Sequence, residues 1–367
     1  MKLSCTQENL NRGLFIVGKT VSSDNALPVL SNVLLRAEKG RLQLSATDLE
    51  IGVVCVINCK IDTEGAITVP ARLLTEYVSS LPGGIIDMEL KKHDLHLALG
   101  EYTATIKGVD AEEFPLIPKV ASETVVEIDA ESFRDAISKV VFATTADESR
   151  PEIAGVFMRE KDESLYLVAT DSYRLAEKKI QGAKFLKKFQ DVILPAKTLQ
   201  ELHRILDGVD EPVKVAIAEN QVLFTCTEIE LISRLIEGQY PDYEQIMPKN
   251  NNTRVEIDAK DFLKTIKITS LFSRSGANDI RLEYDPASDE LALLAVSDQV
   301  GENTSRVKAK TTGEKGAIVF NYRYLIDGIS NMREGAVTVG IGTESSPTLL
   351  LPEGKDDYRY VIMPIKQ

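Results

Sequence analysis

The sequence has no tryptophan and few other aromatic residues, and this scarcity limits the ways in which it can hold nucleic acid. Phe, Tyr and Trp together make up 6% of its 367 residues. Proteins that bind single strands stack successive bases on aromatic rings. A stacking platform for single-stranded nucleic acid is therefore not expected.

Long apolar runs are also missing. No run approaches the roughly 20 residues that a helix needs to cross a bilayer. The N-terminal residues Met1–Glu8 lack the apolar core of a signal peptide. We therefore expect a cytoplasmic protein that has no contact with a membrane.

Cysteine is sparse, at 4 residues, and histidine is sparser still, at 3. Cys55 and Cys59 share one face of a predicted strand, but no histidine or further cysteine stands beside them to complete a zinc site. The pattern predicts structural thiols, no metal site and no cofactor.

The proportions of hydrophobic and charged residues are typical of a globular protein, with more acidic than basic residues. The chain is 43% hydrophobic and 27% charged, and its formal net charge is −13. Because phosphate binding needs clustered Lys and Arg, this net charge argues against tight binding of nucleic acid. The length is sufficient for two or three domains, each with its own core.

An internal repeat organises the chain. Four blocks recur in the same order at a spacing of about 125 residues: an amphipathic helix, a strand that ends in Asp, a short strand that leads into a second helix, and a closing segment with an aromatic residue and a terminal Pro. The predicted helices are 8–20, 70–81, 129–141, 195–206, 259–270 and 321–333. Asp129 and Asp258 stand where they can cap their helices.

The repeat predicts three domains of one fold. We place them at residues 1–122, 123–251 and 252–367, with a linker-like stretch at 248–253. Each copy contains two helices and several short alternating strands, which indicates an α+β fold with its helices on one side of antiparallel sheet. The recurring Asp48, Asp171 and Asp298 are predicted to form turns rather than an active site.

Residues 13–20 match the phosphate-binding pattern of a P-loop letter for letter, from Gly13 to Lys19 and Thr20. A P-loop needs a buried strand before it and an exposed backbone around the phosphates. Here a helix start precedes the pattern, its middle positions are large and apolar, and the other two repeats have a helix in its place. These features argue against nucleotide binding, and the sequence contains no other catalytic constellation.

Several motifs along the whole chain resemble those of the bacterial sliding clamps, the beta subunits of the replicative polymerase. They are Leu27–Asn32, Val69–Arg72, Ala169–Leu175, Glu237–Tyr243 and Val361–Ile365. The resemblance implies three tandem copies of the clamp fold, with helices lining the channel of a ring and antiparallel sheets outside. It also implies a head-to-tail homodimer around double-stranded DNA, without catalysis.

The charges of the predicted helices agree with this resemblance. The six helices contain 12 Lys or Arg and 8 Asp or Glu, although the whole chain is strongly acidic. Mildly basic helices around a channel, with an outside that repels DNA, would keep the contact loose. Solvated helix surfaces remain the simpler explanation for any single residue.

The resemblance also implies a pocket between the second and third repeats that binds short linear peptides. The expected partners are the DNA polymerase III alpha subunit, the clamp loader, repair polymerases, ligase and mismatch-repair proteins. An apolar cleft that includes methionine suits the Leu and Phe anchors of varied partners. Carried over by motif, the pocket residues are Arg150, Ile153, Thr170, Arg174, Leu175, Pro241, Ile246, Asn321, Tyr324, Val361, Met363, Pro364 and Ile365.

The same resemblance assigns DNA contacts to Arg72, Lys197 and Arg274, and a dimer seam to Ala104 and Ile106 on one edge and Leu271 and Phe272 on the other. Three positions depart from the family. Asp24 and Gln245 stand where basic residues are common, and Ala104 is smaller than an anchor residue should be.

Two other hypotheses stay open at this point. One is a P-loop NTPase that uses Lys19, and it requires a glycine-rich loop rather than a helix at 13–20. The other is a scaffold of the same fold that never meets DNA.

Overall fold

The computed structural model describes residues 1–21, 27–120, 123–147, 149–249, 251–273, 278–332 and 335–366. They form two compact units. The first consists of Met1–Arg134, Gly182–Gln190 and Lys197–Leu235, and the second of Asp135–Gln181, Asp191–Ala196 and Ile236–Gln367. The middle repeat therefore contributes to both units, and each unit is described by itself.

The helices lie where the repeat predicts them, within three residues at every end. They are α1 (Gln7–Val17), α2 (Ala71–Ser80), α3 (Ala130–Val140), α4 (Ala196–Ile205), α5 (Ala259–Thr269) and α6 (Tyr322–Ser330). The predicted caps are confirmed. A carboxylate oxygen of Asp129 accepts from the backbone N–H of Ser132 at 2.8 Å, and that of Asp258 accepts from Lys260 and Asp261, both at 3.0 Å.

The first unit contains two antiparallel sheets, with strand orders β5-β1-β7-β8-β9 and β14-β10-β16-β17-β18-β4-β3-β2-β6. Pairing of β4 with β18 connects the first repeat to the second, with Gly52 opposite Ile232. The strands are β1 (Lys2–Thr6), β2 (Asn32–Glu38), β3 (Arg41–Thr47), β4 (Ile51–Asn58), β5 (Lys60–Thr63), β6 (Gly65–Pro70), β7 (Ile85–Lys91), β8 (Asp94–Leu99), β9 (Tyr102–Lys107), β10 (Thr124–Ile128), β14 (Lys184–Phe185), β16 (Val213–Ile217), β17 (Gln221–Cys226) and β18 (Ile229–Arg234).

The second unit has the strand order β15-β11-β12-β13-β26-β25-β24-β19-β22-β21-β20-β23. Pairing of β13 with β26 connects the second repeat to the third, with Leu175 opposite Val361. The strands are β11 (Gly155–Lys161), β12 (Ser164–Thr170), β13 (Arg174–Ile180), β15 (Val192–Pro195), β19 (Thr253–Asp258), β20 (Asp279–Tyr284), β21 (Glu290–Ser297), β22 (Gly301–Thr312), β23 (Gly316–Asn321), β24 (Ala336–Ile341), β25 (Thr348–Pro352) and β26 (Tyr358–Ile362). Both joints between repeats are thus antiparallel strand pairs.

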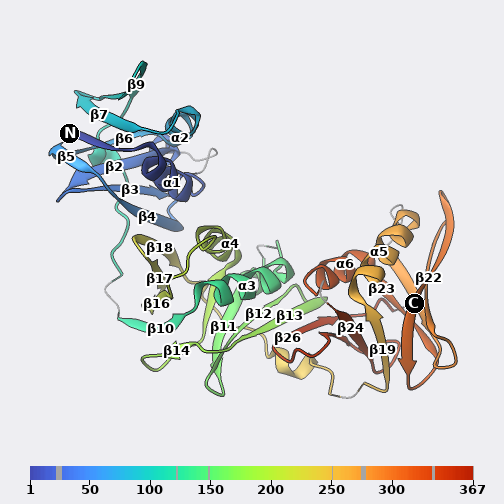
Figure 1. The fold of residues 1–367 in the computed structure, drawn as a ribbon. Helices are drawn as coiled ribbons and strands as arrows, with labels where there is room; N and C mark the ends of the chain where they lie inside the picture. Colours follow the sequence, from blue (N-terminus) through green and yellow to red (C-terminus); the bar gives the residue numbers. More distant parts are fainter. Residues whose placement is uncertain are drawn as a thin grey trace. The chain divides into compact units, whose positions relative to one another are not determined.

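Paired helices cover one face of the sheet in the first and third repeats, α1 beside α2 and α5 beside α6 (Figure 1). Gly13 shows how closely α1 approaches its sheet, because a Cβ at this position would lie 3.0 Å from Leu44 Cδ1 and 3.2 Å from Ile57 Cγ2. The apparent P-loop is therefore a helix packed on a sheet, and its first glycine serves that packing. The NTPase hypothesis, which requires a loop at 13–20, is wrong.

The recurring aspartates form turns, as predicted, in the first two repeats. Asp48 Oδ1 accepts from the backbone N–H groups of Glu50 and Ile51 at 3.0 and 2.7 Å, and Asp171 Oδ1 accepts from Tyr173 and Arg174, both at 3.0 Å. The residue after each aspartate has a positive φ, 77° at Leu49 and 79° at Ser172. In the third repeat the hydroxyl of Ser297 accepts from the backbone N–H of Gln299 instead, at 3.4 Å.

Cys5, Cys55 and Cys226 are buried free thiols, and Cys59 is half-buried. Burial raises the pKa of Cys5 to about 12 and that of Cys55 to about 11, so both stay protonated and unreactive near neutral pH. In the described ranges no helix is both long and apolar enough to cross a bilayer.

Candidate functional site

Three of the predicted peptide-binding residues, Ile153, Leu175 and Val361, belong to one apolar cluster in the second unit. The strand pair β13–β26 forms its centre, and the segment that follows β18 packs across it. Its buried members are Ile153, Val168, Leu175, Ile193, Tyr240, Tyr243 and Val361, with Phe157, Ile236, Met247 and Leu349 packed against them. The structure thus brings together residues from the second and third repeats that lie up to 208 positions apart in the sequence.

The predicted residues differ in how much of each side chain a partner could touch. Ile153, Leu175 and Val361 are at most 1% exposed. Thr170 is buried as well, and its hydroxyl donates to the carbonyl of Arg174 at 2.7 Å. These four support the surface from below.

The accessible surface over the cluster has different members. Pro241 and Arg150 are exposed, as is Ile246 at 40%. The half-buried members are Asn321, Tyr324, Met363, Pro364 and Ile365. We call these eight more accessible side chains the peptide surface.

Arg174 was expected at the edge of the pocket, and the structure shows it held by four groups. Its guanidinium forms ion pairs with Asp171 at 3.0 Å and Asp327 at 2.5 Å. It also donates to the carbonyl of Phe142 at 2.9 Å and lies 4.7 Å from the ring centre of Tyr324. With most of its donors already used, Arg174 joins the second repeat to the third and fixes Tyr324.

Charged residues of β11 hold the segment that carries Ile246. Glu244, within the short 3-10 helix Tyr243–Ile246, accepts from Lys161 at 2.7 Å and from Arg159 at 3.0 Å. The hydrogen bond from Lys161 holds the pKa of Glu244 below its usual range. The side-chain amide of Gln245 donates to Asp242 at 2.7 Å.

Sequence reasoning did not assign roles to the aromatic residues beneath the peptide surface. Tyr240 stacks on Phe157, with 4.8 Å between ring centres and an angle of 6° between the planes. Its hydroxyl donates to the carbonyl of Val168 at 3.3 Å. The motif Glu237–Tyr243 contained this tyrosine, but only the fold shows that it supports the surface from within.

Because three tyrosines are buried, we expect the folded chain to lose stability at alkaline pH. Burial raises the pKa of Tyr240, Tyr358 and Tyr360 above the ordinary value of about 10. The unfolded chain ionises near that value while the folded chain cannot, so stability is complete below about pH 10 and falls as the pH rises further. Urea unfolding followed between about pH 8 and 11 should show this fall.

A matched pair of variants tests the cause. Tyr240→Phe should reduce the alkaline loss, whereas Tyr173→Phe, at a tyrosine that is 62% exposed, should leave it unchanged. An equal effect of the two substitutions would show that burial of Tyr240 is not responsible.

Two of the three predicted DNA contacts lie on described helices. The side chain of Arg72 on α2 is 91% exposed and pairs with Glu76 at 2.8 Å. Lys197 on α4 is 61% exposed and pairs with Asp48. Arg274 and the loop around Asp24 lie outside the described residues.

Each group of predicted seam residues lies in or beside a strand that has an unpaired edge. Ala104 and Ile106 belong to β9, the last strand of its sheet. Ile106 faces the core at 4% exposure, so only its backbone is available to a partner. Leu271, which is 52% exposed, and Phe272 lie in the 3-10 helix Ser270–Phe272. Among the described residues, positions 301–308 of β22 pair with a strand on one side only.

Comparison with known proteins shows which family has this order of three domains. Three family models match in order: the N-terminal domain of the DNA polymerase III beta subunit at residues 1–118, its central domain at 127–242 and its C-terminal domain at 244–366. The chain belongs to the DNA polymerase III beta subunit family. The three tandem clamp domains predicted from the repeat are therefore confirmed.

Individual relatives agree along their full length. The beta sliding clamp of Synechococcus elongatus is 34% identical, with 100% of this chain and 99% of the relative covered. That of Staphylococcus aureus is 29% identical over 95% of this chain and 94% of its own. A sliding clamp structure from Bacillus subtilis has a TM-score of 0.93 at 27% identity, covering 100% of this chain and 99% of its own, and a beta subunit structure from Pseudomonas aeruginosa has a TM-score of 0.94 at 28%, covering 100% of both.

The clamp is a processivity factor of the polymerase III holoenzyme in DNA replication, and it is not an enzyme. Clamps of this family are DNA-encircling rings that bind polymerase and other proteins.

Proposed function

We propose that two copies of this chain associate head to tail into a closed ring around double-stranded DNA. The observation that carries this proposal is the presence of two different open strand edges in one chain, β9 and residues 301–308 of β22. Pairing each of these two edges with the other edge of a second copy would cover both, and closure prevents open polymers. Leu271 and Phe272 would supply apolar contact at the seam, and Ala104 would contribute little.

The helices are proposed to face the DNA and to hold it loosely. The six helices of the described chain contain ten Lys or Arg and seven Asp or Glu, whereas the whole chain carries −13. Weak attraction from the helices and repulsion from the rest favour a contact that slides. Arg72, Lys197 and Arg274 are the proposed contacts, with Lys197 partly neutralised by Asp48.

The peptide surface is proposed to bind short linear motifs of the Gln-x-x-Leu-Phe type in the DNA polymerase III alpha subunit, the clamp loader, repair polymerases, ligase and mismatch-repair proteins. Apolar side chains over a rigid aromatic base suit Leu and Phe anchors, and Met363 can adapt to different ones. Domain boundaries at 122/123 and 251/252 remain our proposal; the first falls in the gap between two matched family models, whereas the second falls within the third model, which begins at residue 244. A cytoplasmic location is proposed because replication partners and DNA are found there.

Retention on circular and linear DNA tests the ring directly. A clamp loaded onto a nicked circle by its loader should stay bound through a gel-filtration column, because only opening of the ring releases it. Cutting the circle once after loading should release nearly all of the protein by sliding off the ends. The retained fraction on each DNA is the measurement.

High salt separates topological from electrostatic holding. Raising the salt concentration weakens phosphate contacts steeply, yet it should leave the clamp on the uncut circle. Equal retention on cut and uncut DNA, or release from the circle by salt alone, would contradict the ring.

A further inference from the structure

The strand pair β4–β18, which joins the first repeat to the second, resembles the pair β13–β26, which joins the second to the third. Different side chains pack at the two joints. The turn at Asp48 matches the turn at Asp171, and Gly52 on β4 occupies the position that Leu175 holds on β13. A Cβ on Gly52 would lie 2.8 Å from Cγ2 of Ile117. The linker from the first repeat therefore inserts Ile117 where the second joint has the side chain of Leu175.

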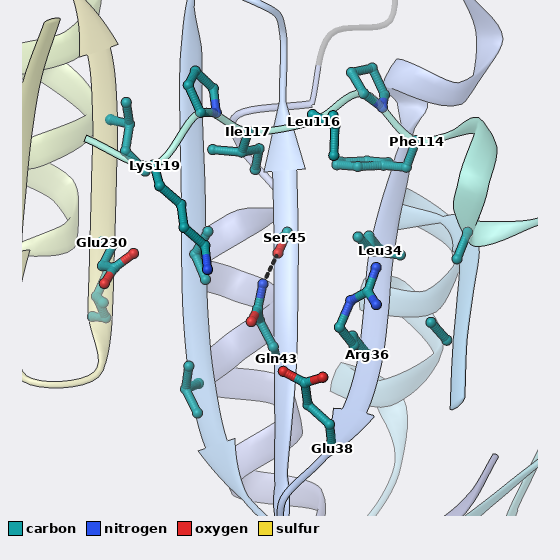
Figure 2. Close-up of a pocket in the computed structure, with 18 of the residues that line it drawn as sticks. Leu34, Arg36, Glu38, Gln43, Ser45, Phe114, Leu116, Ile117, Lys119 and Glu230 are labelled. Carbon is teal, nitrogen blue, oxygen red and sulfur yellow. Dashed lines mark hydrogen bonds between the residues drawn. The ribbon is translucent and has the colours of Figure 1, made fainter. Parts of the chain in front are cut away.

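A long groove remains beside this linker, and it lies wholly within the first unit. Its volume is about 1230 Å³, more than most small-molecule sites of about 300–1,000 Å³. Figure 2 shows the linker Phe114–Lys119 passing across the strands whose outward side chains form the floor. The apolar part of that floor includes Leu34, Val54, Val56, Leu223 and Ile232. An open groove of this size suits an extended chain segment rather than a compact ligand.

An exposed leucine stands on the linker side of the groove. Leu116, which lines it, is 97% exposed, whereas Ile117 next to it is half-buried against the sheet. Such exposure gives no stability to the folded chain and leaves the side chain free to contact a partner. In the corresponding position of the second joint the chain has Asp242.

The charged groups of the groove are mainly acidic and mostly without ion-pair partners. Five carboxylates line it, from Glu38, Asp110, Glu112, Glu228 and Glu230, against two cations, Arg36 and Lys119. Glu228 pairs with Arg41 at 2.9 Å. Within the described ranges none of the other four carboxylates forms an ion pair. Figure 2 shows Glu38 and Glu230 on strands on either side of the groove.

We propose that this groove is a second docking site of the clamp, for an extended segment of a partner protein with basic side chains beside an apolar anchor. The anchor contacts Leu116 and the apolar floor, and the basic side chains pair with Glu38 and Glu230. Charge complementarity selects this occupant over the motifs proposed for the peptide surface, which depend on apolar anchors and a glutamine.

Binding of a synthetic probe tests the proposal on the whole chain. A fluorescein-labelled peptide of alternating leucine and lysine is titrated at low salt and followed by fluorescence anisotropy. We expect saturable binding, about fivefold weaker or more for Glu230→Lys and for Leu116→Ser. A peptide of alternating leucine and glutamate should not bind.

Matched variants in the same unit control for net charge and hydrophobicity. Glu219→Lys reverses an exposed charge outside the groove, and Leu186→Ser removes a leucine that is 55% exposed outside it. Both should bind the probe like the unchanged chain. Equal weakening by the controls would overturn the proposal.

Competition separates this site from the peptide surface. An excess of a Gln-x-x-Leu-Phe peptide should leave probe binding unchanged, and Glu230→Lys should leave binding of that peptide unchanged. Displacement of the probe by the Gln-x-x-Leu-Phe peptide would overturn the second site without touching the proposed function. A change in sedimentation caused by Glu230→Lys or Leu116→Ser would assign the groove to contact between copies, and would also overturn it.

Discussion

Replacing Gly328 with alanine is expected to lower the free energy of unfolding of the second unit by about 3 kcal/mol or more. The added Cβ would lie 2.1 Å from Cε1 and 2.3 Å from Cδ1 of Tyr360. That ring cannot move aside easily, because Tyr360 is fully buried, donates to the carbonyl of Tyr324 at 3.0 Å and lies 5.7 Å from the ring centre of Phe142. Urea unfolding measures the change.

A loss of stability in Gly328→Ala would report the contact with Tyr360, because helix propensity alone predicts a gain. Gly328 lies within α6, where alanine would ordinarily stabilise by about 1 kcal/mol. Gly83→Ala is the control, since a Cβ there has no neighbour within 4 Å, and it should change stability by less than about 0.5 kcal/mol. Gly328→Ala and Tyr360→Ala combined should cost less than the sum of their separate losses, because the two residues are in contact. A neutral or stabilising Gly328→Ala would disprove the close contact.

Removing residues 363–367 is expected to weaken binding of a Gln-x-x-Leu-Phe peptide by about 100-fold or more, on the scale of a central interface anchor. The last strand ends at Ile362, so the deletion leaves every strand intact. It removes the hydrogen bonds from Met363 N–H to Tyr173 and from Ile365 N–H to Val319, both 2.8 Å. These bonds fix the backbone on both sides of Pro364.

Point variants show which part of this tail matters. Met363→Ala alone should weaken the peptide by about tenfold, as expected for loss of an apolar anchor. Lys366→Ala, at an exposed residue of the same tail, should have no effect. Isothermal titration gives the affinities, and thermal unfolding confirms that the variants remain folded. Undiminished binding by the deleted chain would place the peptide elsewhere.

The sequence predicted most of the fold because its information is local and repeated. Helix periodicity, the caps at Asp129 and Asp258 and the turn at Asp171 each depend on residues within a few positions of one another. Comparing three copies also exposed the apparent P-loop as a helix, which a single copy could not have done.

What the sequence could not show depends on contacts between distant residues. Arg174 pairs with Asp327, 153 positions away, so its role in joining two repeats appears only in the fold. Motif comparison placed Leu175, Val361 and Met363 together without showing that the first two are buried. Motif comparison likewise placed Ile106 at the seam without showing that its side chain, by alternation along β9, faces the core.

The two strand-paired joints also determine how a chain of this kind carries mechanical load. At β4–β18 and β13–β26 several backbone hydrogen bonds connect the two antiparallel strands. These bonds must break together when the strands are pulled along their length. Ion pairs such as that of Arg174 with Asp327 add further resistance at the second joint. In a ring of two such chains, tension from a moving polymerase would be borne by these strand pairs within each chain.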